Sequence, residues 1–391
     1  MLADQTLAFA EDLTDALLGM DALCRSDGGE LDDGLVVVNM DPGREAEEFR
    51  TWDEASRRFS QLGQQAQALT EPDRRLYYSQ LCSSTEALIR RYDEGLPFQS
   101  QIAGFLHVAP EPASDAELDV LRADLRSALT DGGYDGDLAD QAAAWERRNV
   151  VPPDEVEGTL NELLDEAWDR TTERMEIPAP KSDGMRVETV SGVAFNARCD
   201  YLNRRVELNI DPILTLPSLK HLAVHECYPG HYVQFKLRET WYREGRAAAD
   251  GLLSLVNSAS SCTFEGIADN GIRVIDWMDG PDDRISSILT RYRAGIGTVA
   301  AWQLHAERRS ESEVREWLRA NSLIGGEGWV ENRMRFIAAP QRSALIWSYW
   351  HGEPAVKSVW DRVSGENRSE FLDFLYGRMH SCQSVALFRP S

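Results

Sequence analysis

Apolar side chains recur at helical spacing along most of this chain, and this periodicity constrains the fold more than any other feature. In the segment 4–24 apolar side chains recur at helical spacing at Leu7, Ala10, Leu13, Leu17 and Leu18, the pattern of an amphipathic helix. Similar spacing predicts helices over 45–69, 73–91, 115–129, 138–148 and 153–174, and an almost wholly helical chain from 217 to about 377. The sequence therefore predicts a mainly α fold.

Two short segments depart from this pattern. Residues 32–43 form a β-branched run closed by a Pro-Gly turn, and residues 192–210 contain two alternating runs around Leu202 and Asn203. The second segment is typical of a small antiparallel β-hairpin. The Pro- and Gly-containing stretch 177–184 separates a predicted N-terminal helical region, 1–176, from a C-terminal region, 185–391, that carries the candidate site. One continuous domain is the alternative.

The charge of the chain excludes some classes of partner. The sequence has 65 acidic and 41 basic residues, a formal net charge of −24. Nucleic acids and anionic membrane surfaces both require concentrated basic residues, so neither is expected as a partner. The N-terminal residues lack a basic segment followed by an apolar one, no window reaches the about 18 apolar residues of a membrane span, and the six cysteines are scattered. We therefore expect free thiols and a cytoplasmic location.

The histidines are concentrated at one place in the sequence. Three of the seven, His221, His225 and His231, lie within eleven residues, and Glu226 follows His225 directly. A zinc hydrolase needs two imidazoles on the metal and a carboxylate beside them to activate the bound water. A spacing of six residues would place His225 and His231 on different faces of a regular helix. Because Pro229 and Gly230 lie between the two histidines, a bulged or broken turn could bring them together.

A third ligand is expected downstream, in the segment FEGIADNG. Its carboxylates, Glu265 and Asp269, are four residues apart and would share one face of a helix. This segment resembles that of the thermolysin-like gluzincins, in which one carboxylate is the third zinc ligand and an aspartate orients a ligand histidine. The resemblance implies that Glu265 binds the metal and that Asp269 is an orienting partner.

A longer pattern, HExxPGHxxQ followed by an FxEG-like segment, resembles the bacterial family called domain of unknown function 885. The matching positions are His225, Glu226, Pro229, Gly230, His231 and Gln234, then Phe264, Glu265 and Gly266. Members of that family are described as metallopeptidases with a largely helical fold, which implies a large helical metallopeptidase-like fold with a cleft. This chain has Tyr232 where the family often has a second histidine, and EGIADN where it commonly has EGWALY. These departures leave the substrate class open.

The leading hypothesis is a zinc-dependent hydrolase that cleaves a peptide or amide bond in a small molecule or short peptide. His225, His231 and Glu265 would bind the metal, and Glu226 would activate the metal-bound water. Tyr349 and His351 are the candidate donors to the developing oxyanion, with aromatic packing as the alternative for this segment. His221 is expected to be a packing or orienting partner rather than a fourth ligand.

Two further residue groups have competing interpretations. Cys227 could offer a soft ligand, but a buried inert thiol is the simpler expectation. Arg291 and Arg293 could hold a substrate carboxylate, although a salt bridge on so acidic a chain is the simpler interpretation.

Two rival functions remain open from the sequence. Two histidines and one carboxylate are also the ligands of non-haem iron oxygenases, so iron is the alternative metal, and a lyase or isomerase of a biosynthetic pathway is also conceivable. The second rival is a non-catalytic binding protein on the same scaffold. The sequence does not indicate the oligomeric state.

Overall fold

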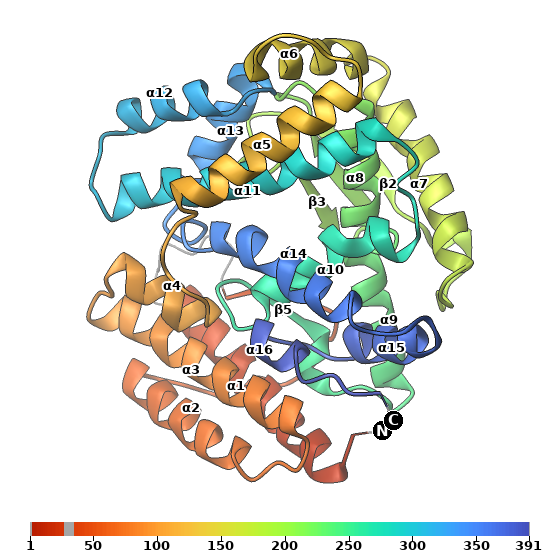
Figure 1. Ribbon diagram of the computed structural model, residues 1–391. Helices are drawn as coiled ribbons and strands as arrows, with labels where there is room; N and C mark the ends of the chain where they lie inside the picture. Colours follow the sequence, from red (N-terminus) through yellow and green to blue (C-terminus); the bar gives the residue numbers. More distant parts are fainter. Residues whose placement is uncertain (1, 27–34, 391) are drawn as a thin grey trace. The chain divides into compact units, whose positions relative to one another are not determined.

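The computed structural model describes residues 2–26 and 35–390, and the described chain is mainly helical with two small sheets (Figure 1). The predicted mainly α fold is therefore confirmed. The chain divides into two compact units made of separated stretches: Met1–Pro110, Val233–Ile267 and His351–Ser391 form one, and Glu111–Tyr232 and Ala268–Trp350 form the other. The predicted division of the sequence into an N-terminal region, 1–176, and a C-terminal region, 185–391, stays a prediction.

The first unit is built on a layer of N-terminal helices. Helix α3 (Pro72–Asp93) packs against α2 (Trp52–Ala66) and α4 (Phe98–Leu106), and α1 (Asp4–Ser26) packs against α2. The later helices of this unit are α15 (Arg368–Gly377) and α16 (Cys382–Val385). Strands β1 (Val36–Asn39) and β5 (Leu253–Leu255) pair antiparallel, with Val36 opposite Leu255. This pairing joins two parts of the unit that are far apart in sequence.

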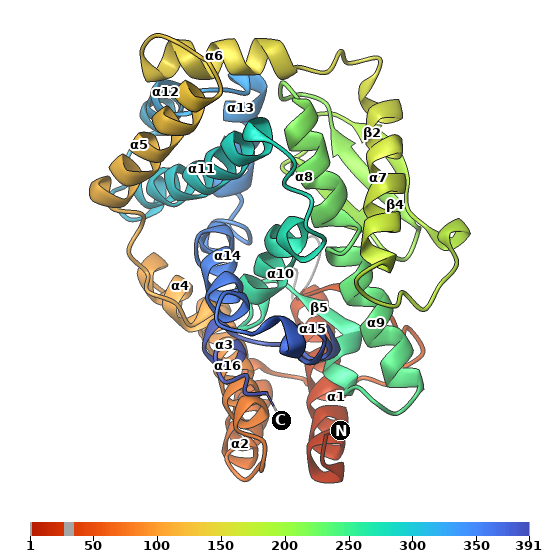
Figure 2. The ribbon, with the colours of Figure 1, turned by 45° about the vertical axis from the view of Figure 1, so that its right-hand side comes forward.

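The second unit contains the longest helix, α11 (Pro281–His305), with α5 (Asp115–Asp131) along it (Figure 2). Helices α6 (Leu138–Asn149), α12 (Glu311–Asn321) and α13 (Gly326–Ala338) complete this part. A buried apolar cluster fills the space between α5, α6 and α11; its members include Leu125, Trp145 and Leu289. Helix α7 (Val156–Thr172) packs against α8 (Leu216–Glu226), which carries the first histidines of the motif.

A three-stranded sheet lies in the second unit, in the order β2-β4-β3. Strands β3 (Ala197–Asp200) and β4 (Arg205–Asn209) are antiparallel, with Asp200 opposite Arg205, so the predicted hairpin is confirmed. The connecting turn is fixed by Asp200, whose carboxylate accepts hydrogen bonds from Asn203. Strand β2 (Arg186–Val190) adds to the other edge of β4 in parallel, which the alternating pattern alone did not predict.

Several predicted boundaries move in the structure. The helix expected from 45 begins only at Trp52, because Thr51 caps it by accepting a hydrogen bond from the backbone of Glu54. Helix α4, for which the helical spacing gave no range, begins at Phe98, since a proline with φ of −53° directly before a helix is compatible with its first turn. The long C-terminal helical region is interrupted by β5. Of the run 32–43, residues 32–34 lie outside the described residues, and the rest contains β1.

Among the described residues, no helix combines the length and the apolar character that crossing a membrane requires.

Candidate metal centre

The helix that carries His225 ends directly after it, and this end determines the position of His231. Helix α8 starts at a capping box in which Thr215 and Ser218 exchange hydrogen bonds. It stops at Glu226, where Cys227 leaves the helical conformation with φ of −124° and ψ of −81°. After Pro229 and Gly230 a new helix, α9 (His231–Arg243), begins at His231. The six-residue spacing is thus divided between two helices.

Gly230 permits this connection because the backbone comes very close to the end of α8. Its N–H donates to the carbonyl oxygen of Val224 at 2.9 Å. A Cβ atom at this position would lie 1.8 Å from the carbonyl oxygen of His225 and 2.3 Å from that of Val224. No side chain can occupy such a space, so glycine is a geometric requirement here.

The break in the helix returns His231 to His225. The two ring centroids are 4.7 Å apart, and the rings are nearly perpendicular, at 83°. Both residues are buried. The broken turn considered from the sequence is therefore the conformation that the structure adopts.

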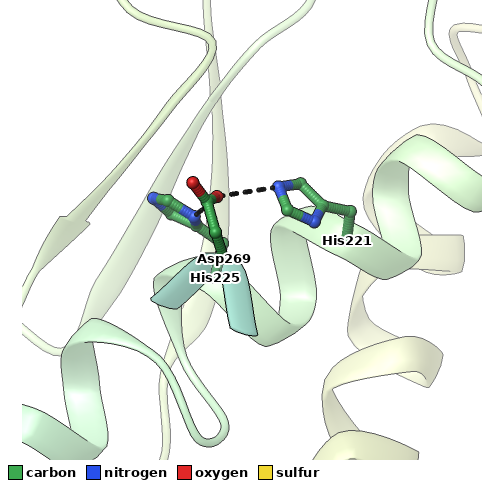
Figure 3. A group of neighbouring side chains, drawn as sticks. All are labelled: His221, His225 and Asp269. Atoms are coloured by element: carbon green, nitrogen blue, oxygen red, sulfur yellow. Dashed lines mark hydrogen bonds and ion pairs between the residues drawn. The ribbon is translucent and has the colours of Figure 1, made fainter. Parts of the chain in front are cut away.

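Asp269 lies beside His225, between it and His221 (Figure 3). Helix α10 (Ser261–Val274) carries Asp269, whose Oδ1 accepts a hydrogen bond from Nδ1 of His225 at 2.9 Å and lies 3.4 Å from Nε2 of His221. Burial alone would raise the pKa of the Asp269 carboxyl, but the two imidazoles outweigh it and hold this pKa well below its usual range. The carboxylate fixes the ring of His225 and leaves its Nε2 for a metal.

Two overlapping groups of side chains could hold a metal ion among the described residues. His225, His231 and Glu265 form one, and His221, His225 and Asp269 form the other; in each group the ligand atoms lie within 4.8 Å of one another. Tetrahedral zinc with bonds of about 2.0–2.1 Å places its ligands roughly 3.3 Å apart. In the second group Asp269 is already engaged by its hydrogen bond with His225, whereas the first group does not include Asp269.

Glu226 follows the ligand candidate His225 and is buried. Its carboxylate lies close to two buried thiols, Cys199 on β3 and Cys227. Burial raises the pKa of both thiols well above the ordinary value, and the charge of Glu226 raises it further. Because a metal binds the thiolate, these protonated cysteines match the expectation of inert thiols.

A hydrogen-bonded clamp, to which the sequence assigned no role, lies one turn beyond His231 on α9. Gln234 donates from Nε2 to the carbonyl oxygen of Phe264 at 3.1 Å and accepts from Nη2 of Arg238 at 3.2 Å. The Arg238 guanidinium also lies over the ring of Phe264, 5.7 Å from its centroid. Both polar side chains are buried. They tie α9 to the residue directly before Glu265, and the glutamine of HExxPGHxxQ was the only signal for them.

The candidate oxyanion donors lie on α14 (Ile346–Trp360). The ring of Tyr349 packs against Phe336 at 6.1 Å and 65°. His351 precedes Gly352, where α14 meets α10 so closely that a Cβ at Gly266 would lie 2.1 Å from the Gly352 carbonyl oxygen. Within the first unit, the backbone at Gly352, directly after His351, therefore lies against the turn of α10 that carries Glu265. The role of Tyr349 and His351 as oxyanion donors stays a prediction.

Comparisons with known proteins extend to the fold. No protein-family model matches the sequence, and no curated protein matches it. The chain is similar in structure to a "putative lipoprotein" from Colwellia psychrerythraea, with a TM-score of 0.53 at 14% identity, over 86% of this chain and 60% of the other. A "putative lipoprotein of unknown function" from Shewanella oneidensis gives a TM-score of 0.52 at 12% identity, over 85% of this chain and 72% of the other. The chain thus spans about 60% of the length of the first of these structures. At these identities the likeness concerns the fold, and it leaves the function to the chemistry of the site.

Proposed function

We propose that this protein is a zinc-dependent hydrolase of a peptide or amide bond in a small molecule or short peptide. The observation that carries the proposal is the convergence of His225, His231 and Glu265, with Glu226 next to the first ligand. Two imidazoles and one carboxylate are the protein ligands of several zinc hydrolases and leave one metal position open. The motif resemblance to domain of unknown function 885 points to the same activity, although it rests on the motif residues alone because no family model matches the chain.

Each residue has a distinct task in this proposal. Bound to the three ligands, zinc would supply Lewis-acid polarisation of the scissile carbonyl and acidify a coordinated water. The Glu226 carboxylate would take a proton from the attacking water and deliver it to the leaving nitrogen. Asp269 would hold the His225 ring through Nδ1. A donor from Tyr349 or His351 would stabilise the developing oxyanion. The predicted cytoplasmic location is part of the proposal, and cell fractionation tests it.

Replacing Glu226 with glutamine tests the mechanism. The substitution preserves shape and removes the proton acceptor, so turnover of a peptide-library substrate should fall at least about a hundredfold while zinc remains stoichiometric. His225→Ala is the matched variant, which should lose both zinc and activity. A fully active Glu226→Gln protein would refute the proposed mechanism.

Iron is the second candidate metal, because the same donor set suits Fe(II). Elemental analysis of protein purified without added metal separates the two. Stoichiometric zinc supports the hydrolase, whereas stoichiometric iron with oxygen-dependent turnover would replace it by an oxidative enzyme. Protein without stoichiometric metal that tolerates His225→Ala would favour the binding-protein alternative.

A further inference from the structure

Two half-buried arginines in the second unit have fewer carboxylates beside them than they have positive charges. Both are distant in sequence from the proposed metal ligands. Arg293 lies on α11 and Arg333 on α13. Among the described residues, Glu146 is the one carboxylate that opposes the charge of Arg293, and no carboxylate opposes that of Arg333, whose neighbour is the neutral phenol of Tyr349. This is unexpected in a chain with a net charge of −24, because charged groups removed from water are normally paired.

The two guanidinium groups share one aromatic platform. The Cζ of Arg293 lies over the ring of Trp329 at 4.4 Å from its centroid, and the Cζ of Arg333 at 5.3 Å. The ring of Phe336 lies 5.7 Å from the Arg333 guanidinium and 6.1 Å from the ring of Tyr349. Arg333 on α13 and Tyr349 on α14 therefore contact the ring of the same phenylalanine.

Arg293 has two partners that limit its freedom. Its Nη2 donates to the carbonyl oxygen of Ile324. Its guanidinium lies against Gly325, where a Cβ atom would be 2.3 Å from Nη2. Glu146, the nearby carboxylate, accepts the backbone N–H of Gly325 through Oε1 at 2.5 Å. Arg293 is thus fixed in position, and Glu146 compensates at most one of the two positive charges.

Arg333 keeps most of its donors for another partner. Its Nε is covered by protein and meets no acceptor in the described part of the chain. Arg333 and Tyr349 are each half-buried as whole residues. Burial lowers the pKa of Arg293 to about 9 and that of Arg333 to about 10, and Arg333 adds to the effect on Arg293. A bound anion would relieve this uncompensated charge.

We propose that Arg333, in the field of Arg293 and beside Tyr349, binds a small-molecule carboxylate. The planar guanidinium presents parallel N–H donors that match the two oxygens of a carboxylate, and one net positive charge in the cluster matches one monoanion. The aromatic rings hold both guanidinium groups in place before the ligand arrives. None of its residues belongs to either candidate ligand group, and Tyr349 is the one residue that it shares with the roles proposed above.

The test uses the full-length protein depleted of metal with EDTA, so that the anion cannot bind through zinc. Calorimetric titration with sodium acetate at constant ionic strength should give saturable one-to-one binding in the millimolar range, which a four-atom ligand can reach. Sodium chloride and inorganic phosphate are the comparison probes. The absence of saturable acetate binding, or equally tight chloride or phosphate binding, would overturn the proposal of a carboxylate site. Failure of the acetate titration leaves the hydrolase proposal intact. Conversely, full activity of Glu226→Gln would refute the hydrolase mechanism and leave the carboxylate site intact.

Variants on α13 locate the binding to Arg333. Arg333→Met should weaken acetate binding at least about tenfold, the loss of one charge-assisted pair. Arg335→Met is the matched control, because Arg335 lies two residues further on, is exposed and faces Asp211 at 3.5 Å; its binding should equal that of the wild type. Arg333→Lys keeps the charge and the fold but loses the paired donors, so its affinity for acetate should lie between that of the wild type and that of Arg333→Met. Wild-type affinity in both Arg333 variants would overturn the assignment.

Discussion

Asp269→Asn is the perturbation that most directly tests how the protein prepares its metal ligands. The Asp269 carboxylate accepts a hydrogen bond from Nδ1 of His225 at 2.9 Å, and asparagine keeps the size and one acceptor oxygen while it removes the charge. A hydrogen bond to a charged group contributes about 1.5–3 kcal/mol and a neutral one about 1 kcal/mol. The difference, roughly 0.5–2 kcal/mol, corresponds to about a 2- to 30-fold rise in the dissociation constant for zinc.

Competition with a chromophoric zinc chelator measures this constant at pH 7.5. His221→Asn is the matched control, because His221 lies at the longer distance of 3.4 Å from the same carboxylate oxygen, and its effect should stay below about threefold. Two results would refute the reasoning. Zinc binding of wild-type affinity in Asp269→Asn would show that the carboxylate does not prepare His225. A large loss in His221→Asn, with little loss in Glu265→Gln, would assign the metal to the other group, His221, His225 and Asp269.

Three other predictions follow from the packing around the motif. Gly230→Ala should abolish stoichiometric zinc binding and lower the thermal midpoint, because its Cβ would lie 1.8 Å from the His225 carbonyl oxygen. Gly43→Ala, where a Cβ would meet no atom within 4 Å, is the control, and retained zinc in Gly230→Ala contradicts the argument. Gln234→Met should weaken zinc binding about three- to tenfold while the protein stays folded, since it removes the hydrogen bond to Phe264; unchanged affinity by the chelator assay would reduce the clamp to a packing role. Burial, helped by the charge of Arg74, holds the pKa of His380 well below its ordinary value, so the folded state keeps it neutral while the unfolded chain takes up a proton below about pH 6.5. As the pH is lowered from 6.5 to 5, this group should therefore reduce the unfolding free energy of the metal-free protein by up to about 1.4 kcal/mol per pH unit. In His380→Gln the unfolding free energy, measured by urea titration at each pH, should depend less steeply on pH, and an equal pH dependence in the two proteins contradicts this.

Local patterns predicted the helices and the hairpin because their causes are local. Helical spacing located α1, α3 and α5 closely, and alternation around Leu202 located β3 and β4. The parallel pairing of β2 with β4 has no such local signal, because it depends on where the chain returns after the hairpin is formed. Errors at helix ends, such as the start of α2 at Trp52, reflect a single capping hydrogen bond that competes with a continuing periodic pattern.

The sequence by itself determined the types of ligand and their order along the chain: two histidines, an adjacent glutamate, and two carboxylates one helical turn apart. Only the tertiary structure decided that a helix ends between His225 and His231, because that depends on the close approach of Gly230 to the α8 carbonyls. It also decided that His225 is the histidine to which Asp269 hydrogen-bonds, and that Arg333 meets no carboxylate among the described residues. Whether a charge is paired depends on which side chains the fold brings within a few ångströms. Those side chains often belong to residues distant in sequence, so local patterns do not reveal them.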